Sequence, residues 1–181
     1  MHALLALDQQ ITSFIYSLLP HTHILDLFFG FLSLQGSSII IWLIPLGYLF
    51  IVEEMQDHRF ALFFLGTLST VYVISDILLK NIIQRPRPDA FAIAANICPP
   101  TYSFPSSHAA LAFAAALLLS RFDRKRWGFY YVIAVLIAGS RIYLQCHYVL
   151  DVVSGALIGS FIAWVILSFY IEASYTKKKK G

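Results

Sequence analysis

The residues best suited to chemistry lie in a short polar stretch between two long apolar runs, residues 140–151 with the sequence SRIYLQCHYVLD. An ionisable side chain at membrane depth is costly unless it is paired or faces a cavity, and this stretch holds Arg141, His147 and Asp151. The spacing of His147 and Asp151 brings side chains together on one face of a helix. A carboxylate in that position can hold one imidazole nitrogen and leave the other basic and free. The pattern therefore predicts a catalytic histidine supported by an aspartate.

Two further polar clusters precede this stretch. In the first, Lys80 is followed after six residues by the Arg-Pro pair at Arg87; the second has the sequence PSSH at 105–108, where a helix is expected to begin. Taken singly, a cation could merely extend to the membrane surface, and Asp151 could simply cap a helix. Two histidines, an aspartate and three cations in this order favour a joint function over separate structural roles.

Groups of these types suit a phosphate. Cations and aimed N–H donors stabilise the charge on the equatorial oxygens of a transferring phosphoryl group. Arginine can hold two oxygens with its planar fork, and N–H groups at a helix N-terminus attract anions. The phosphate-binding residues that we expect are Lys80, Arg87, Ser106, Ser107 and Arg141, and the catalytic residues are His108, His147 and Asp151.

The three clusters resemble the signature of the type 2 phosphatidic acid phosphatase (PAP2) superfamily. That signature is Lys-x6-Arg-Pro, Pro-Ser-x-His and Ser-Arg-x5-His-x3-Asp, and the resemblance covers roughly residues 60–170 as a catalytic core. The first and third motifs match in full, whereas Ser107 stands where glycine is commonest in the second. Vanadium haloperoxidases and glucose-6-phosphatases share the constellation, so it indicates phosphate-like binding more firmly than it indicates a substrate.

The resemblance also implies a mechanism. His147 attacks phosphorus and becomes phosphohistidine, while Asp151 holds its tautomer. His108 protonates the leaving oxygen and later activates water. This chemistry implies no cofactor and no metal, and the sequence shows no carboxylate cluster for Mg²⁺ near these loops.

The composition predicts an integral membrane protein. Of 181 residues, 59% are hydrophobic and 13% are charged, with a mean hydropathy of +0.72, whereas soluble domains carry about 25% charged residues. The basic residues are few, dispersed and next to apolar runs, which argues against a nucleic-acid partner. We expect one membrane domain over residues 1–181, with the bilayer and a membrane lipid as partners and no indication of oligomeric state.

Periodicity predicts an all-α, polytopic helix bundle of about six helices. Five are spans or near-spans, and residues 1–23 form an N-terminal amphipathic segment in the membrane interface or a sixth helix. The apolar run 24–52 is long for one span and short for two, so its course is left open. Prolines make 81–105 irregular. Other helices are expected at 60–79, from Ser106 or Ser107 to about 119, from Trp127 to 140 or 143, and at 151–170, where Gly155 and Gly159 suit close packing.

Basic segments indicate the orientation. Arg121–Arg126 and the Lys177–Lys180 tail are expected to be cytoplasmic, together with the loop 53–59. Counting spans from these segments places all three motifs on the outer, periplasmic face of the inner membrane.

Several neighbouring residues have two interpretations. Asp76 lies one helical turn before Lys80, which favours a structural tether over catalysis. For Arg85, a solvated loop cation is favoured over a phosphate ligand. Cys98 and Cys146 fall on the same side and either form a disulfide or remain free thiols.

The function that we expect is a membrane lipid phosphatase acting on a phosphate monoester or diphosphate. Undecaprenyl diphosphate is the first candidate substrate, because the short chain resembles the bacterial members of the superfamily that recycle that carrier, and phosphatidylglycerol phosphate and phosphatidic acid are next. The alternative is a non-enzymatic transporter or phosphate-lipid-binding relative. A transporter needs a polar path across the bilayer, and the apolar runs at 60–79 and 152–170 contain few polar residues.

Overall fold

The structure is a computed structural model that describes residues 2–34, 37–52, 58–88, 98 and 100–180. Every regular element among these residues is helical. In chain order they are α1 (His2–Leu18), α2 (His23–Ser33), α3 (Ser37–Val52), α4 (His58–Tyr72), the π-helix η1 (Val73–Leu78), α5 (Leu79–Ile83), α6 (Ser107–Phe122), the 3₁₀-helix η2 (Arg124–Arg126), α7 (Trp127–Tyr143) and α8 (Val149–Lys180).

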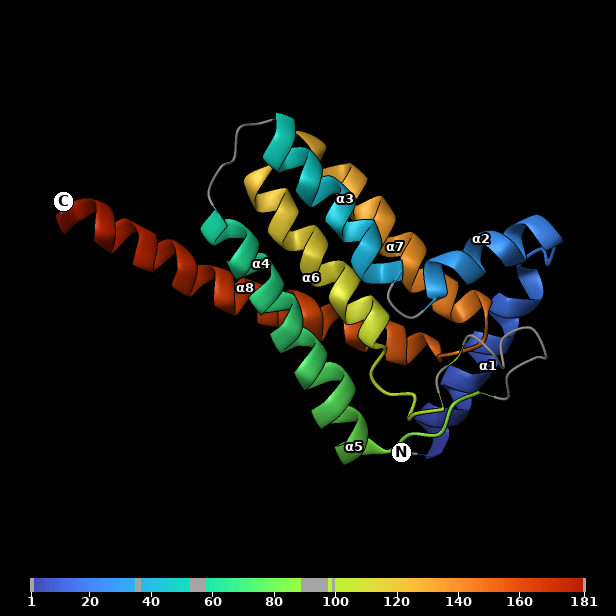
Figure 1. The fold of residues 1–181 in the computed structure, drawn as a ribbon. Helices are drawn as coiled ribbons and strands as arrows, with labels where there is room; N and C mark the ends of the chain where they lie inside the picture. The colour runs from blue at the N-terminus through green and yellow to red at the C-terminus, as the bar shows by residue number, and fades with distance from the viewer. Residues whose placement is uncertain (1, 35–36, 53–57, 89–97, 99, 181) are drawn as a thin grey trace.

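Helix α6 lies at the centre of the bundle and packs against α4, α7 and α8 (Figure 1). Its sequence explains this position, because six of its residues are alanine and small side chains let neighbouring helices approach closely. Ten of its sixteen residues are buried. Ser106 caps its N-terminus by accepting a bond from the Ala109 N–H, as the sequence predicted.

Two glycines of α8 bring that helix into backbone contact with α6. A Cβ atom at Gly155 would lie 2.4 Å from the carbonyl oxygen of Ser106, and one at Gly159 would lie 2.0 Å from that of Ala110. Only a residue without a side chain fits at such distances. The predicted small-residue face is therefore confirmed, and α6 is its partner.

Among the described residues, two helices are long and apolar enough to cross a membrane, Phe60–Ile83 with 24 residues and Val149–Ile171 with 23 residues. The first comprises α4, η1 and α5 without interruption, so it extends beyond the predicted end at residue 79. Together with the composition and the family described below, these helices place the chain in a membrane.

The helix count differs from the predicted six. The described residues form seven helical segments when α4, η1 and α5 are taken as one and η2 is left out. The extra helix arises because the apolar run 24–52 divides into α2 and α3. Residues 53–57 of the predicted cytoplasmic loop lie outside the described residues.

The N-terminal segment forms a helix, and two of its polar side chains point into the protein. Asp8 and Thr12 are buried, while Leu7, Phe14 and Leu18 on the opposite side are exposed. Helical periodicity shows that the two faces differ and does not show which one meets solvent or lipid. The apolar face of α1 is thus left for the bilayer, while Asp8 and Thr12 contact the motif-bearing end of the bundle.

The start of α6 and the turn between α7 and α8 lie near α1 and α5, at one end of the bundle (Figure 1). The connection between α6 and α7, which contains η2 and its three basic residues, lies at the other end (Figure 1). All three sequence motifs therefore meet at the end remote from the basic turn.

We expect Gly159→Ala to destabilise the fold, because the added methyl group overlaps the Ala110 carbonyl of α6. Overpacking of this kind costs about 1–3 kcal/mol, and unfolding in detergent followed by circular dichroism measures it. Gly66→Ala is the matched control, since a Cβ there meets nothing within 4 Å. Equal unfolding transitions for the two variants would contradict the close α6–α8 contact.

Candidate active site

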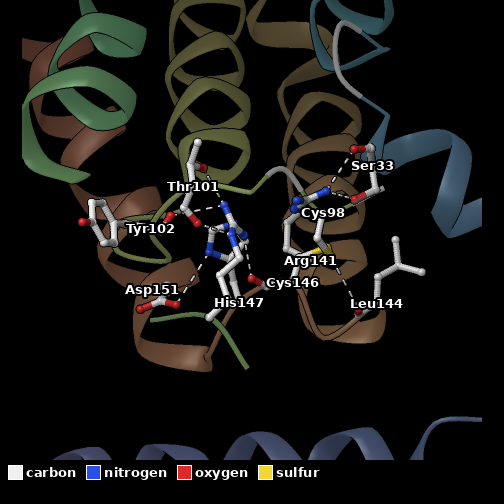
Figure 2. Close-up of a disulfide and its surroundings, with 10 residues drawn as sticks. Ser33, Cys98, Thr101, Tyr102, Arg141, Leu144, Cys146, His147 and Asp151 are labelled. Atoms are coloured by element: carbon white, nitrogen blue, oxygen red, sulfur yellow. Dashed lines mark hydrogen bonds and ion pairs between the residues drawn. A yellow bond between two sulfur atoms is a disulfide. The ribbon is translucent and has the colours of Figure 1, made fainter. Parts of the chain in front are cut away.

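Arg141, near the C-terminal end of α7, is completely buried. Its Nη1 donates to the backbone carbonyl of Ser33, at the end of α2, over 2.9 Å and also contacts the Ser33 hydroxyl (Figure 2). Its Nε and Nη2 have no hydrogen-bond acceptor in the described part of the chain. Leaving buried donors unsatisfied is costly, so this guanidinium is suited to an anionic ligand that accepts from both nitrogens.

His147 lies in the turn between α7 and α8, two residues before α8 begins, and it is 1% exposed. Its Nε2 is 3.0 Å from Arg87 Nη1, and its Nδ1 is 3.6 Å from Oδ2 of Asp151. The expected pairing with Asp151 is thus present at ion-pair distance, but it joins a turn to a helix and not two positions on one helix. Burial, reinforced by Arg141, Arg87 and Lys80, lowers the pKa of His147 well below its ordinary value.

Arg87 follows α5 and is held by backbone carbonyls of the motif loops. Its Nε donates to Thr101 O over 2.7 Å and its Nη1 to Cys146 O over 2.7 Å, while Nη2 donates to the Thr101 hydroxyl and the Tyr102 carbonyl. Burial lowers the pKa of Arg87 to about 10, against the opposing effect of nearby carboxylates. A phosphate would have to replace some of these carbonyls on the guanidinium.

Lys80 is 3% exposed and forms an ion pair with Asp76, which is the tether favoured by the sequence. Asp76 also accepts a hydrogen bond of 2.8 Å from the Ser107 hydroxyl. It belongs to the π-helix η1, and such local widenings of a helix occur frequently at functional sites. The carboxylate therefore links the first motif to the start of α6.

The PSSH segment forms the first turn of α6 and meets the start of α8. The backbone N–H of Ser106 donates to the carbonyl of Asp151 over 3.0 Å. It is therefore not available to a phosphate, contrary to the expectation from the sequence. The N–H groups of Ser107 and His108 belong to the first turn of the helix, where intrahelical acceptors are lacking. His108 lies within electrostatic range of Arg141, His147 and Lys80, so the second histidine joins the cluster.

Arg85 is a candidate functional residue whose role the sequence did not reveal. It is not a solvated loop cation, because its side chain is 11% exposed and donates to both Asp8 and Asp151 over 2.7 Å. Its guanidinium also lies 4.0 Å from the ring centroid of Tyr148. No local pattern could identify Asp8 as its partner, since 77 residues separate them.

A disulfide joins Cys98 to Cys146 and leaves no free cysteine (Figure 2). Cys146 directly precedes His147, and its carbonyl accepts the bond from Arg87. The bridge therefore ties the loop after the first motif to the turn that holds His147, and the alternative of two free thiols does not apply.

The family model of the PAP2 superfamily matches residues 60–175. The chain belongs to the PAP2 superfamily. The matched region includes all three motifs and excludes α1, α2 and α3.

Relatives of this PAP2 chain include two polyprenyl-lipid phosphatases by name. Decaprenylphosphoryl-5-phosphoribose phosphatase of Mycobacterium tuberculosis is 38% identical over 91 residues, which cover 50% of each chain. Undecaprenyl-diphosphatase of Sulfolobus acidocaldarius is 34% identical over 120 residues, covering 62% of this chain and 57% of that one. The chain thus spans only about half the length of these curated relatives.

A solved structure has the same fold. The crystal structure of the transmembrane PAP2 type phosphatidylglycerolphosphate phosphatase from Bacillus subtilis matches with a TM-score of 0.72 and 24% identity. The match covers 95% of this chain and 88% of that one. The structural match therefore includes the N-terminal helices, which lie outside the region that the family model matches.

We expect a reductant to lower the thermal stability of the protein, because opening the Cys98–Cys146 bridge frees a 48-residue loop in the unfolded chain. Loss of such a bridge costs about 2–4 kcal/mol, measured as a lower unfolding temperature with dithiothreitol. A Cys98→Ser/Cys146→Ser double variant is the control and should not respond to the reductant. An unchanged wild-type transition after confirmed reduction would contradict the expectation.

The lowered pKa of His147 predicts a pH-dependent stability. Below the ordinary histidine pKa of about 6.5, the unfolded chain binds a proton at this position before the folded protein does. The free energy of unfolding should therefore fall with decreasing pH, by up to about 1.4 kcal/mol per pH unit for this one group. Denaturation at pH 7.5 and pH 5.5 should show a smaller loss for His147→Gln than for wild type. Equal losses would show that His147 titrates normally.

Proposed function

We propose that this PAP2 protein is a membrane lipid phosphatase that removes phosphate from a lipid phosphate monoester or diphosphate through a phosphohistidine at His147. The observation that carries the proposal is the buried Arg141, whose Nε and Nη2 find no acceptor among the described residues, beside a buried histidine that lies at ion-pair distance from Asp151. Two N–H donors of one arginine that lack acceptors match two oxygens of a phosphate. No group of three or more His, Cys, Asp and Glu side chains suited to a metal occurs among the described residues.

In the proposed reaction, the Nε2 lone pair of His147 forms the bond to phosphorus. The bond from phosphorus to the leaving oxygen breaks, and His108 gives that oxygen its proton. In the second half, His108 removes a proton from water, which attacks phosphorus and releases phosphate from Nε2. The lowered pKa of His147 supports this role, because the imidazole stays neutral and nucleophilic at neutral pH.

The cations have separate tasks in this mechanism. Arg141 binds two equatorial oxygens, and Lys80 contributes charge from its fixed position against Asp76. Arg87 is the cation that must move. Its Nη1 leaves the Cys146 carbonyl and His147 Nε2 and binds a phosphate oxygen instead. Ser106 and Ser107 position the first turn of α6, whose remaining N–H groups point to the anion.

A lipid substrate fits an apolar groove next to the site. The groove has a volume of about 260 Å³ and is lined by Leu65, Leu68, Ser69, Tyr72, Val73 and Leu111. Tyr72 at its edge hydrogen bonds to Asp76, the partner of Lys80. A tail in this groove would keep its phosphate near the cations while remaining in the membrane.

We further propose that the site opens on the outer, periplasmic face of the inner membrane, with the η2 turn and the C-terminal tail in the cytoplasm. The three consecutive basic residues of η2 at the opposite end support this orientation. Undecaprenyl diphosphate is the preferred candidate substrate, since two relatives carry polyprenyl lipids in their names. Residues 60–170 form the catalytic core of a single membrane domain in this proposal.

The test is phosphate release by purified protein in detergent with EDTA, from undecaprenyl diphosphate, phosphatidylglycerol phosphate and phosphatidic acid in parallel. We expect release that survives EDTA, and a loss of at least about 1,000-fold in kcat for His147→Ala, because the nucleophile is removed. The relative values of kcat/KM identify the substrate class.

His23→Ala is the matched control, since His23 is exposed at the start of α2 and outside the three motifs. It should retain wild-type activity. Folded wild-type protein that releases no phosphate from any of the three lipids would refute the phosphatase and favour binding or transport.

A further inference from the structure

The two oxygens of the Asp151 carboxylate have different partners. Oδ2 accepts from the Tyr148 N–H over 3.0 Å and from the Ser103 hydroxyl, and it faces His147 Nδ1 at 3.6 Å. Oδ1 accepts from Arg85 Nη1 over 2.7 Å. Because Asp151 is completely buried, these contacts with the described residues hold the rotation of its carboxylate. Arg85 holds the far oxygen and thereby directs the near oxygen to the histidine.

Arg85 is itself held in place by the N-terminal helix. Its Nη2 donates to Oδ2 of Asp8 over 2.7 Å, so one guanidinium bridges two buried carboxylates. The planar fork of arginine allows this double contact, which a single ammonium group cannot reproduce with the same geometry. The Tyr148 ring covers the guanidinium at 4.0 Å.

Asp8 and Thr12 also bind the first turn of α8. The Leu150 N–H donates to Asp8 Oδ1 over 3.0 Å, and the Val149 N–H donates to the Thr12 hydroxyl over 3.1 Å. These backbone groups lie at a helix start, where no intrahelical acceptor is available. Helix α1 thus supplies from a distant part of the sequence the capping groups of the helix that carries Asp151.

We infer that Asp8 and Arg85 are positioning residues for catalysis, which act through Asp151 on the imidazole of His147. The inference rests on the proposed function, in which His147 is the nucleophile. Among the described residues, the side-chain polar contacts of Asp8 and Arg85 are with each other, with Asp151 and with the start of α8, and not with Lys80, Arg87 or Arg141, so we expect substrate binding to be independent of them. When Asp8 or Arg85 is replaced, the Asp151 carboxylate can turn away from His147 Nδ1. The transition state is then stabilised less, whereas the affinity for the substrate is unchanged.

A double-mutant cycle tests the inference with purified protein and the lipid that gives the highest rate. Arg85→Gln should lower kcat by about 10- to 100-fold, the usual effect of losing a group that orients a reacting side chain, with KM within about twofold. Asp8→Asn keeps an oxygen for the Leu150 N–H and loses only the ion pair. It should lower kcat in the wild-type background and cause no further loss in the Arg85→Gln background.

Two controls separate positioning from simple docking of α1. Thr12→Val removes the acceptor of the Val149 N–H and leaves the Asp8–Arg85 pair, so it should lower the unfolding temperature with kcat within about twofold. Gln9→Ala changes an exposed residue of the same helix and should alter neither quantity. Arg85→Lys retains the charge and should recover part of kcat.

The outcomes distinguish this inference from the proposed function. If wild-type protein is active but Asp8→Asn and Arg85→Gln change only the unfolding temperature, or act additively on kcat, the inference is refuted and the phosphatase stands. If folded wild-type protein is inactive on all lipids tested, the proposed function fails, and the inference fails with it.

Discussion

The concentration of buried positive charge at one end of the bundle is the constraint on which the site depends. Lys80 and Arg141 are almost inaccessible to water, and Arg87 is partly buried next to them. Cations so close repel one another and are costly to desolvate, so each needs a fixed partner. Carboxylates and backbone carbonyls of the surrounding structure act as these partners. Among the described residues, two N–H donors of Arg141 remain for a ligand. An anion would complete a charge balance that the protein alone leaves positive.

Close helix packing converts this charge arrangement into defined geometry. The glycines of α8 allow it to touch the α6 backbone, and this contact places the Ser106 N–H on the carbonyl of Asp151. The second and third motifs are therefore joined by a main-chain hydrogen bond as well as by their side chains. A wider helix separation would move His108 and His147 apart, so the small residues serve the chemistry as much as the fold.

The sequence predicted what depends on local spacing. Trp127–Tyr143, the cap at Ser106 and the close-packing glycines were found because capping and periodicity are local properties. The contacts of Arg85 with Asp8 and of Arg141 with Ser33 were missed, since they join positions 77 and 108 residues apart. The inward direction of Asp8 and Thr12 in α1 was missed for another reason. The apolar side chains of a membrane helix can face lipid, so its polar side chains are free to point into the protein. The order of the motifs predicted that the three clusters meet, but it did not show which contacts hold them in place.

The Cys98–Cys146 bridge gives the molecule a closed covalent ring, which contains α6, η2 and α7. The basic turn Arg124–Arg126 lies inside this ring, at the end remote from the site (Figure 1). A trypsin cut in that turn would open the ring without releasing either half, because the sulfur atoms still connect the two fragments beside His147. Nicked protein would migrate as one chain on a non-reducing gel and as two after reduction, and the end that holds His147 would keep its covalent connection.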